Sequence, residues 1–297
     1  MSLIISPTSY KDNQIYKSIT PYLILINIFV WILLEMFGDS QSSIYLIKSG
    51  ALFGPLVSEG EYWRLLLPIF IHVGIIHLLF NQLALLIFGR LNEYSYGKLQ
   101  FLTIYIFSGL FANLLSYYIT PFNISAGSSG GIFGIAGSYL SFLLFQKPKN
   151  LIDNKENLLG ISIIISINLL YGLTDSKIDN WAHIGGLISG FIIGLLILKI
   201  FKSNCTFLVN YKQSSRMIIL IIILLVILFL NIYIRSVNLK ENAHTHIFSA
   251  KVHVENGQNQ KAFDELNIAR DIAAENKDLN TLNNVKNLIQ SLNQIEK

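Results

Sequence analysis

Apolar runs separated by short polar segments dominate the first 234 residues of the chain. A helix of about 20 apolar residues crosses the hydrocarbon core of a bilayer. Seven runs reach this length, within a few residues at either end, so the pattern predicts an all-α membrane protein. The predicted spans are 21–37, 75–91, 99–119, 129–145, 158–173, 181–201 and 217–234.

The pattern changes sharply after residue 234, where Asn, Glu, Lys and Ala replace the long apolar runs. Apolar positions recur there at helical spacing on either side of Gly257, and we expect a third helix near 279–295. The first two helices resemble a single tetratricopeptide-type hairpin, although one repeat has no neighbours on which to stack. Two interpretations stay open: a solvated helical tail without a partner, or a docking module for another protein. The three histidines of this tail are interpreted as surface residues: His244, His246 and His253.

Composition supports the membrane assignment. The chain is 52% hydrophobic and 13% charged, with a mean hydropathy of +0.51, whereas soluble domains carry roughly 25% charged residues. The single cysteine, Cys205, has no partner for an internal disulfide. The stretch to about residue 20 is polar and lacks the order of a cleavable signal peptide. We expect no cofactor and no nucleic-acid partner.

The distribution of Lys and Arg predicts the orientation in the membrane. With the N-terminus inside, the inner segments hold 11 of these residues, and the outer loops between the spans hold 3. Lys and Arg accumulate on the cytoplasmic side, which favours this orientation in a bacterial plasma membrane. The expected order is a cytoplasmic N-terminus (1–20), a six-span core (21–201), a cytoplasmic loop (202–216), a seventh span (217–234) and an extracytoplasmic helical tail (235–297).

Four polar residues fall at a similar depth in this arrangement. Spans two, four and six all run from outside to inside, and each carries polar residues in its first turns. Polar side chains inside a membrane are costly unless they face a bundle interior or a water-filled cavity. We therefore expect an outward-facing site formed by His77, Asn81, Ser129 and His183.

These residue types suit acyl transfer. A serine hydroxyl needs a neighbouring base, and histidine is the usual one. No acidic residue accompanies His183 inside its span, and Asp175 and Asp179 lie in the preceding loop, so we expect a Ser–His dyad. Backbone N–H groups at a helix start, with the side chains of His77 and Asn81, are natural donors to an oxyanion.

The same residues have three other interpretations: helix packing, a metal site, and a path for a solute or proton. A Gly- and Ser-rich start to a membrane helix is most often a packing feature, because small residues let helices approach closely. Three histidines are potential metal ligands, but the chain lacks the His-Glu-x-x-His spacing and a cysteine partner, so no metal is expected. A solute or proton path is disfavoured because the polar groups gather near one face. These histidines are His72, His77 and His183.

Five short motifs, in order along residues 50–194, give the chain a family resemblance. They are Trp63-Arg64; His72 with His77-Leu78-Leu79-Phe80-Asn81; Glu93 and Gly97; Gly127-Ser128-Ser129-Gly130; and Ala182-His183 with Gly186 and Gly190. Together they resemble the motifs of the rhomboid intramembrane serine proteases. The resemblance implies a six-helix core bundle, here followed by a seventh transmembrane helix and a polar helical tail.

The resemblance also implies roles for individual residues. Ser129 would be the nucleophile and His183 the general base and acid, and Asn81, His77 and the Ser129 backbone N–H would form the oxyanion hole. Phe133 stands where some members carry Tyr, and an apolar aromatic ring still stacks on histidine. Structural roles near the site are implied for Trp63, Arg64, His72, Glu93, Gly97, Gly127, Gly130, Phe133, Gly186 and Gly190.

The implied activity is cleavage of transmembrane-helix substrates near the outer membrane face through an acyl-enzyme. The expected partners are transmembrane proteins and the lipid bilayer, with a protein partner for the tail as one of its two open interpretations. The fifth predicted span, with Gly160 and Gly172 near its ends, is expected to be a lateral gate. The alternative function is a catalytically silent rhomboid-like protein that binds membrane helices.

Overall fold

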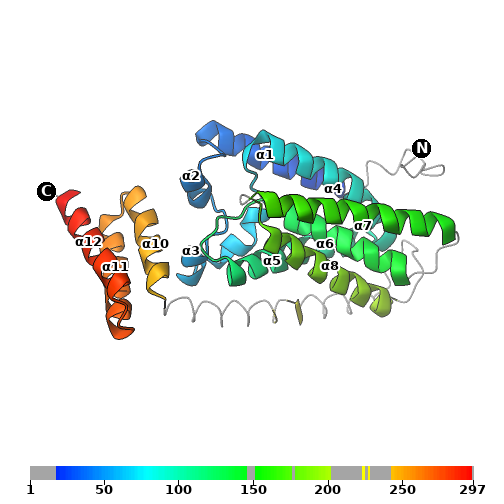
Figure 1. Cartoon of the computed structure of the whole chain (residues 1–297). Helices are drawn as coiled ribbons and strands as arrows, with labels where there is room; N and C mark the ends of the chain where they lie inside the picture. The colour runs from blue at the N-terminus through cyan, green and yellow to red at the C-terminus, as the bar shows by residue number, and fades with distance from the viewer. Residues whose placement is uncertain are drawn as a thin grey trace.

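The protein is described by a computed structural model that covers residues 18–145, 151–175, 178–201, 223–224, 227 and 242–295. A bundle of long helices stands beside three shorter helices near the C-terminus (Figure 1). In chain order the elements are α1 (Thr20–Phe37), α2 (Ser43–Lys48), α3 (Gly54–Ser58), the 3-10 turns η2 (Tyr62–Leu65) and η3 (Leu67–Phe70), α4 (Gly74–Tyr96), α5 (Lys98–Ile119), α6 (Ser129–Phe145), α7 (Leu151–Thr174), α8 (Asn180–Phe201), α10 (Ala243–Glu255), α11 (Asn259–Glu275) and α12 (Leu279–Ile295).

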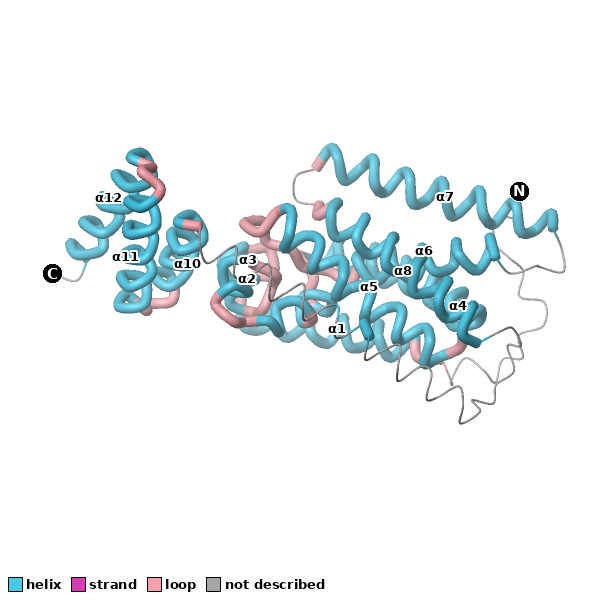
Figure 2. Tube along the Cα trace, turned by 90° about the horizontal axis from the view of Figure 1, so that it is seen from below, coloured by secondary structure: helices cyan, strands magenta, loops and turns pink. Residues whose placement is uncertain are grey.

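The all-α prediction is confirmed. Among the described residues, β-structure is limited to one isolated antiparallel bridge between Leu52 and Ser125, and the trace in Figure 2 is helix and loop throughout. In the described part of the chain, five helices are long and apolar enough to cross a membrane, namely α1, α4, α5, α7 and α8, and α6 is a shorter apolar helix. The protein is therefore a multi-pass membrane protein. The predicted seventh span, 217–234, lies outside the described residues except for 223, 224 and 227.

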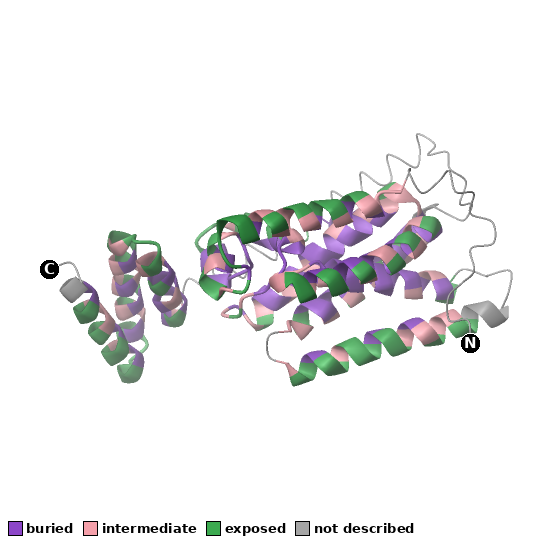
Figure 3. Cartoon of the chain, turned by 90° about the horizontal axis from the view of Figure 1, so that it is seen from above, coloured by how far each residue is buried: buried purple, intermediate pink, exposed green. Residues whose placement is uncertain are grey.

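Burial separates central helices from lipid-facing ones. In Figure 3 the outward sides of α1, α4 and α7 are largely exposed, and burial concentrates on α5, α6 and α8. Large apolar side chains are exposed on the outer helices, for example Phe29, Phe80 and Leu170. Lipid hydrocarbon is a favourable environment for such side chains, so their exposure agrees with a membrane location.

The ends of α1 and α4 are tied together by one carboxylate. Glu93, in the last turns of α4, accepts hydrogen bonds from the backbone N–H of Ile19 at 2.8 Å and from the hydroxyls of Ser18 and Thr20 at 2.6 and 3.0 Å. The first N–H groups of a helix have no partner within it, so Glu93 caps α1. The helix α4 then stops at Gly97, whose φ of 91° suits glycine.

Glycines bring α6 and α8 into backbone contact. A Cβ atom added at Gly190 would lie 2.0 Å from the carbonyl oxygen of Gly134, and one at Gly186 would lie 2.0 Å from that of Gly130. No side chain fits between the two helices at these points. Small residues at regular spacing thus allow the close approach that membrane helices use for van der Waals packing.

A partly helical loop, residues 38–73, covers the end of the bundle where α6 and α8 begin. Its organising side chain is Arg64, which is only 4% exposed. Arg64 donates hydrogen bonds to the carbonyl oxygens of Ile47 and Ala51 at 2.6 and 3.0 Å and pairs with Glu61. A buried guanidinium with several acceptors holds the separate turns of the loop in place.

The three helices α10, α11 and α12 form a small layer with its own apolar core, as the spacing around Gly257 predicts. The interpretation of the tail histidines as surface residues is wrong for His246, which is 7% exposed and pairs with Glu265. It is also wrong in part for His253, because Glu59 of the outer loop pairs with it. Only His244 is fully exposed as predicted.

Adding a methyl group at Gly190 is expected to destabilise the bundle. Gly190→Ala places a Cβ against the backbone oxygen of Gly134, which cannot move aside without moving α6. Overpacking of this kind costs about 1–3 kcal/mol, so the thermal midpoint in detergent should fall by roughly 3–10 °C.

Gly160→Ala in α7 is the matched control, because a Cβ there meets no atom within 4 Å. Its midpoint should stay the same or rise slightly, since Ala favours a helix over Gly. Equal midpoints for the two variants would contradict the backbone contact.

Candidate active site

The site is built around two residues at the starts of α6 and α8. Ser129 is the first residue of α6, and His183 lies in the first turn of α8. His183 Nε2 is 3.0 Å from Ser129 Oγ. A hydroxyl within hydrogen-bond reach of an imidazole nitrogen can transfer its proton to that nitrogen as it attacks. The structure therefore brings together the two residues that the sequence singles out.

The distance between these side chains depends on the glycines below them. Gly130 follows Ser129, and its carbonyl lies where a Cβ on Gly186 would stand. A Cβ on Gly130 would in turn meet the side chain of Ala112 of α5 at 2.5 Å. Larger residues at these positions would separate α5, α6 and α8 and break the hydrogen bond between Ser129 and His183.

The ring of Phe133 fixes the plane of the His183 imidazole. Phe133 lies one turn after Ser129 on α6, and the two ring centroids are 4.3 Å apart with an interplanar angle of 11°. Stacking of this kind limits ring rotation while leaving the edge nitrogens free to form hydrogen bonds. The other ring nitrogen, His183 Nδ1, is buried and has no hydrogen-bond partner among the described residues.

His77 of α4 lies close to Ser129. A Cβ on Gly127 would lie 2.7 Å from His77 Cε1 and 3.7 Å from Ser129 Oγ. Gly127 has a φ of 138°, a conformation that L side chains rarely adopt. The absence of a side chain at Gly127 thus leaves room for the His77 imidazole beside Ser129.

Asn81 lies one turn after His77 on α4. Its side chain is buried, and its amide nitrogen donates to the backbone carbonyl oxygen of His77 at 2.9 Å. This bond holds Asn81 on the same face of α4 as His77. The arrangement places two side chains with N–H groups near Ser129, although the amide of Asn81 is directed toward its own helix.

A buried hydrogen-bond network supports Ser128, the residue before Ser129. His72 Nε2 lies 3.0 Å from the hydroxyl of Ser128, and His72 Nδ1 lies 3.2 Å from the carbonyl oxygen of Phe70. Gln82 of α4 approaches the same Nε2, and Asn27 of α1 donates to Gln82. The carbonyl of Phe70 requires a proton on Nδ1, so Nε2 acts as the acceptor. The sequence gives no reason to single out Ser128, yet its hydroxyl anchors this network.

Asp179 is a second residue that the sequence does not assign to the site. It precedes α8, and its carboxylate accepts from the backbone N–H of Ala182 at 3.0 Å and from the hydroxyl of Ser116 at 2.5 Å. Asp179 is thus the N-cap of α8 and ties that helix to α5. The signal in the sequence is an Asp three residues before Ala182 at the start of an apolar run, which is typical of an N-cap.

The remaining residues of the motifs lie around the site and do not touch Ser129. Trp63 is half exposed, and its ring carries the guanidinium of Arg64 at 4.5 Å. Glu93 and Gly97 lie at the far end of α4, where they cap α1 and end α4. These residues act on the shape of the bundle.

Comparison with known proteins agrees with the arrangement of the site. Residues 59–200 match the model of the Rhomboid domain. The chain is 35% identical to the putative rhomboid protease YdcA of Bacillus subtilis over 144 residues, which is 48% of this chain and 71% of that protein. The chain belongs to the rhomboid family.

Other rhomboid relatives are matched over shorter shares of their length. The rhomboid protease GluP of Bacillus subtilis is 42% identical over 172 residues, or 58% of this chain and 33% of GluP. The mitochondrial RHOMBOID-like protein 6 of Arabidopsis thaliana is 40% identical over 165 residues, or 54% of this chain and 52% of that protein. The chain therefore spans about a third of one relative and half of the other, and the rhomboid match ends before α10.

Removing the cap on α8 should weaken the rhomboid core. Asp179→Ala leaves the N–H of Ala182 and the hydroxyl of Ser116 without their acceptor. Loss of an N-cap costs about 0.5–2 kcal/mol, so the thermal midpoint in detergent should fall by roughly 2–8 °C.

Asp179→Asn is the control, because an Asn side-chain oxygen accepts the same bond and caps helices about as well as Asp. A midpoint for the Asn variant as low as that of the Ala variant would show that the cap is not what stabilises α8.

Proposed function

We propose that this protein is an intramembrane serine endopeptidase that cleaves transmembrane-helix substrates. The observation that carries the proposal is the 3.0 Å contact between Ser129 Oγ and His183 Nε2 inside an apolar helical bundle. The names of two relatives support it: GluP is a rhomboid protease and YdcA is a putative rhomboid protease. No cofactor or metal takes part in the proposed reaction.

The reaction proceeds by acyl transfer. Ser129 Oγ attacks the carbonyl carbon of the scissile bond while His183 Nε2 takes the hydroxyl proton. The tetrahedral intermediate collapses as His183 returns the proton to the leaving amine, and the product is an ester on Ser129. A water molecule, deprotonated by His183, then attacks the ester and releases the second product.

The negative oxygen of the intermediate needs hydrogen-bond donors. Ser129 is at the N-terminus of α6, where the first backbone N–H groups lack partners in the helix and the helix dipole favours negative charge. His77 stands beside Gly127, close to Ser129. We assign the oxyanion hole to the Ser129 N–H, His77 and Asn81, with the Asn81 amide turning from its own helix toward the substrate.

Hydrolysis of a peptide bond in a transmembrane helix requires local unwinding, because the backbone hydrogen bonds of the helix shield that bond. Substrates with Gly or Pro near the level of Ser129 are therefore favoured, since both residues weaken a helix. We propose α7 as the lateral gate. It packs against α6 and α8, and large side chains along it are exposed, for example Leu159, Ile167 and Leu170.

The proposed orientation places the N-terminus in the cytoplasm and the tail outside a bacterial plasma membrane. The starts of α6 and α8 lie at the end of the bundle that faces α10, and α8 ends at the opposite end (Figures 1 and 2). The excess of Lys and Arg in the inner segments supports this orientation. The active site then opens toward the outer face.

Replacing the two dyad residues should abolish activity. Ser129→Ala and His183→Ala each remove one member of the proton-transfer pair, and kcat/KM should fall by at least about 10³-fold. Asn81→Ala should cost about 10- to 100-fold, because other donors remain. The measurements are cleavage of a panel of membrane-helix substrates in detergent and labelling by a serine-directed fluorophosphonate.

Phe29→Ala, on the exposed side of α1, is the control and should be labelled by the fluorophosphonate like the unmodified protein. Neither labelling nor cleavage by the unmodified protein would refute the protease proposal and favour a catalytically silent protein that binds membrane helices. Labelling that survives Ser129→Ala would show that another residue is the nucleophile.

A further inference from the structure

The helix α10 packs on the outer loops of the core through an aromatic side chain. The ring of Phe248 stacks on that of Phe122, with centroids 4.9 Å apart at an angle of 26°, and meets the edge of Phe53 at 6.3 Å. Val252, one turn further along α10, is buried in the same cluster with Leu56. An apolar face of α10 is therefore covered by the core of its own chain.

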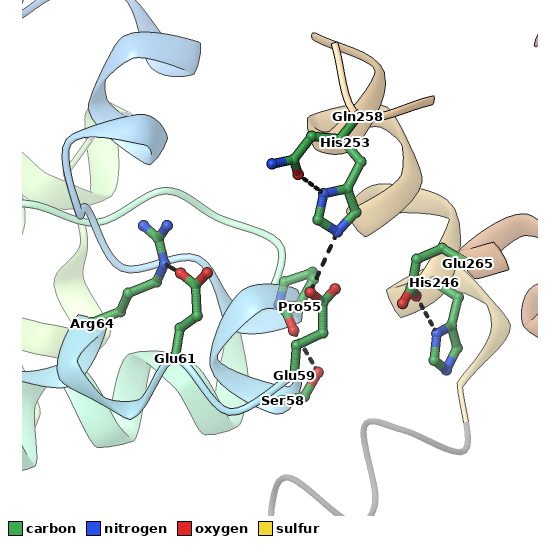
Figure 4. A network of polar contacts seen from close by, with 9 residues as sticks. All are labelled: Pro55, Ser58, Glu59, Glu61, Arg64, His246, His253, Gln258 and Glu265. Atoms are coloured by element: carbon green, nitrogen blue, oxygen red, sulfur yellow. Dashed lines mark hydrogen bonds and ion pairs between the residues drawn. The ribbon is translucent and has the colours of Figure 1, made fainter. Parts of the chain in front are cut away.

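Polar contacts surround this aromatic contact. His253 Nε2 lies 3.5 Å from a carboxylate oxygen of Glu59, and Lys48 Nζ donates to the backbone carbonyl oxygen of Glu255 at 3.2 Å. Figure 4 shows His253 directed across the gap between α10 and α3 toward Glu59. Burial raises the pKa of Glu59, and the nearby His253 opposes that rise. The interface thus has an apolar centre and a polar edge, as specific interfaces do.

The segment beneath Phe248 leads directly to the nucleophile. Phe122 belongs to the loop 120–128, which joins α5 to Ser129. This loop is held from one side by the outer loop: Gly54 N donates to Pro121 O at 2.8 Å, and Leu52 and Ser125 exchange two backbone hydrogen bonds of 2.9 and 3.1 Å. From the other side, Gly127 N donates to Pro68 O at 2.9 Å.

We propose that Phe248 is a positioning residue for the reaction, because it presses on the loop whose last residues place the Ser129 hydroxyl and N–H. The helix α10 then contributes to the catalytic domain by holding the loop that precedes Ser129. This inference rests on the proposed protease function. It differs from both interpretations of the tail that the sequence left open, because the face of α10 that carries Phe248 docks on the protein's own core.

The position of Phe248 relative to the substrate makes the proposal specific. Phe248 contacts the loop before Ser129 directly through Phe122, and through Phe53 it contacts the outer loop that is bonded to the same segment. Both routes reach Ser129 through the backbone of this loop, so Phe248 acts on the catalytic step and not on substrate binding. Loss of the ring should therefore lower kcat and leave KM nearly unchanged. A residue that merely keeps the tail folded would leave both values unchanged.

The test uses the full-length protein in detergent with the variant Phe248→Ala. An aromatic pair of this kind corresponds to about a 2- to 10-fold change. We expect kcat and the rate of fluorophosphonate labelling to fall by that factor, with KM within about 2-fold of the unmodified protein. Hydrogen exchange of the amides in 121–127 should become faster by a similar factor.

Two variants serve as controls. Phe248→Leu keeps an apolar side chain in the cluster and should recover most of the activity. Leu279→Ala removes an apolar side chain of the tail that is 70% exposed and lies outside the interface, and it should change neither kcat nor exchange in 121–127.

A double-mutant cycle with Phe122→Ala separates contact from general destabilisation. If Phe248 acts through Phe122, the effect of Phe248→Ala on kcat should largely vanish in the Phe122→Ala background. A full, additive effect there, or a Phe248→Ala variant that matches Leu279→Ala, would overturn the proposal.

The outcome remains distinguishable from failure of the protease proposal. If the unmodified protein neither cleaves nor is labelled, the proposed function fails, while hydrogen exchange in 121–127 still decides the contact. Unchanged exchange in Phe248→Ala overturns the positioning role whatever the activity. Faster exchange supports it.

Discussion

The contact between the backbones of α6 and α8 is the constraint on which the site depends. At Gly186 and Gly190 of α8, the carbonyl oxygens of Gly130 and Gly134 of α6 occupy the space where a Cβ would stand. The side chains of Ser129 and His183 are short, so the 3.0 Å contact between Oγ and Nε2 requires α6 and α8 to pack closely. The glycines thus convert a packing preference of membrane helices into a catalytic distance. The stacked ring of Phe133 then removes the remaining freedom of His183.

Around this contact, buried polar groups are joined to backbone atoms of other elements. His72 reaches Phe70 and Ser128, Asp179 reaches Ala182 and Ser116, and Arg64 reaches the carbonyl oxygens of Ile47 and Ala51. Unpaired polar groups are expensive in a membrane interior. Breaking any of these hydrogen bonds would leave a buried polar group unpaired. The networks therefore hold the starts of α4, α6 and α8 in fixed positions relative to one another. A site preorganised in this way loses little free energy to reorganisation during the reaction.

The sequence predicts six spans, from 21–37 to 181–201, that coincide with described helices, because apolar length is a local property. From their shared depth it also predicts that Ser129 and His183 lie close together, as they do, while their catalytic roles stay predictions. It misses Asp179 and Ser128, whose partners Ser116 and His72 lie on other elements and are identified only by the packing. It also misassigns His246 and His253. The spacing of residues in an amphipathic tail does not show which surface covers a histidine, so the sequence alone favours a solvated side chain. That surface is formed here by α11 and by Glu59, and neither neighbour follows from the spacing of residues in α10.

The tie between Glu93 and the start of α1 has a consequence for assembly. The acceptor stands 73 to 75 residues after the donors it satisfies. Because α1 precedes α4 in the chain, it begins with N–H groups that find their partner only when the end of α4 has been made. Until then α1 lacks its cap, and in lipid an uncapped end is a strained one. The two helices run antiparallel, and the single carboxylate that closes the pair is available only after α4 has been synthesised.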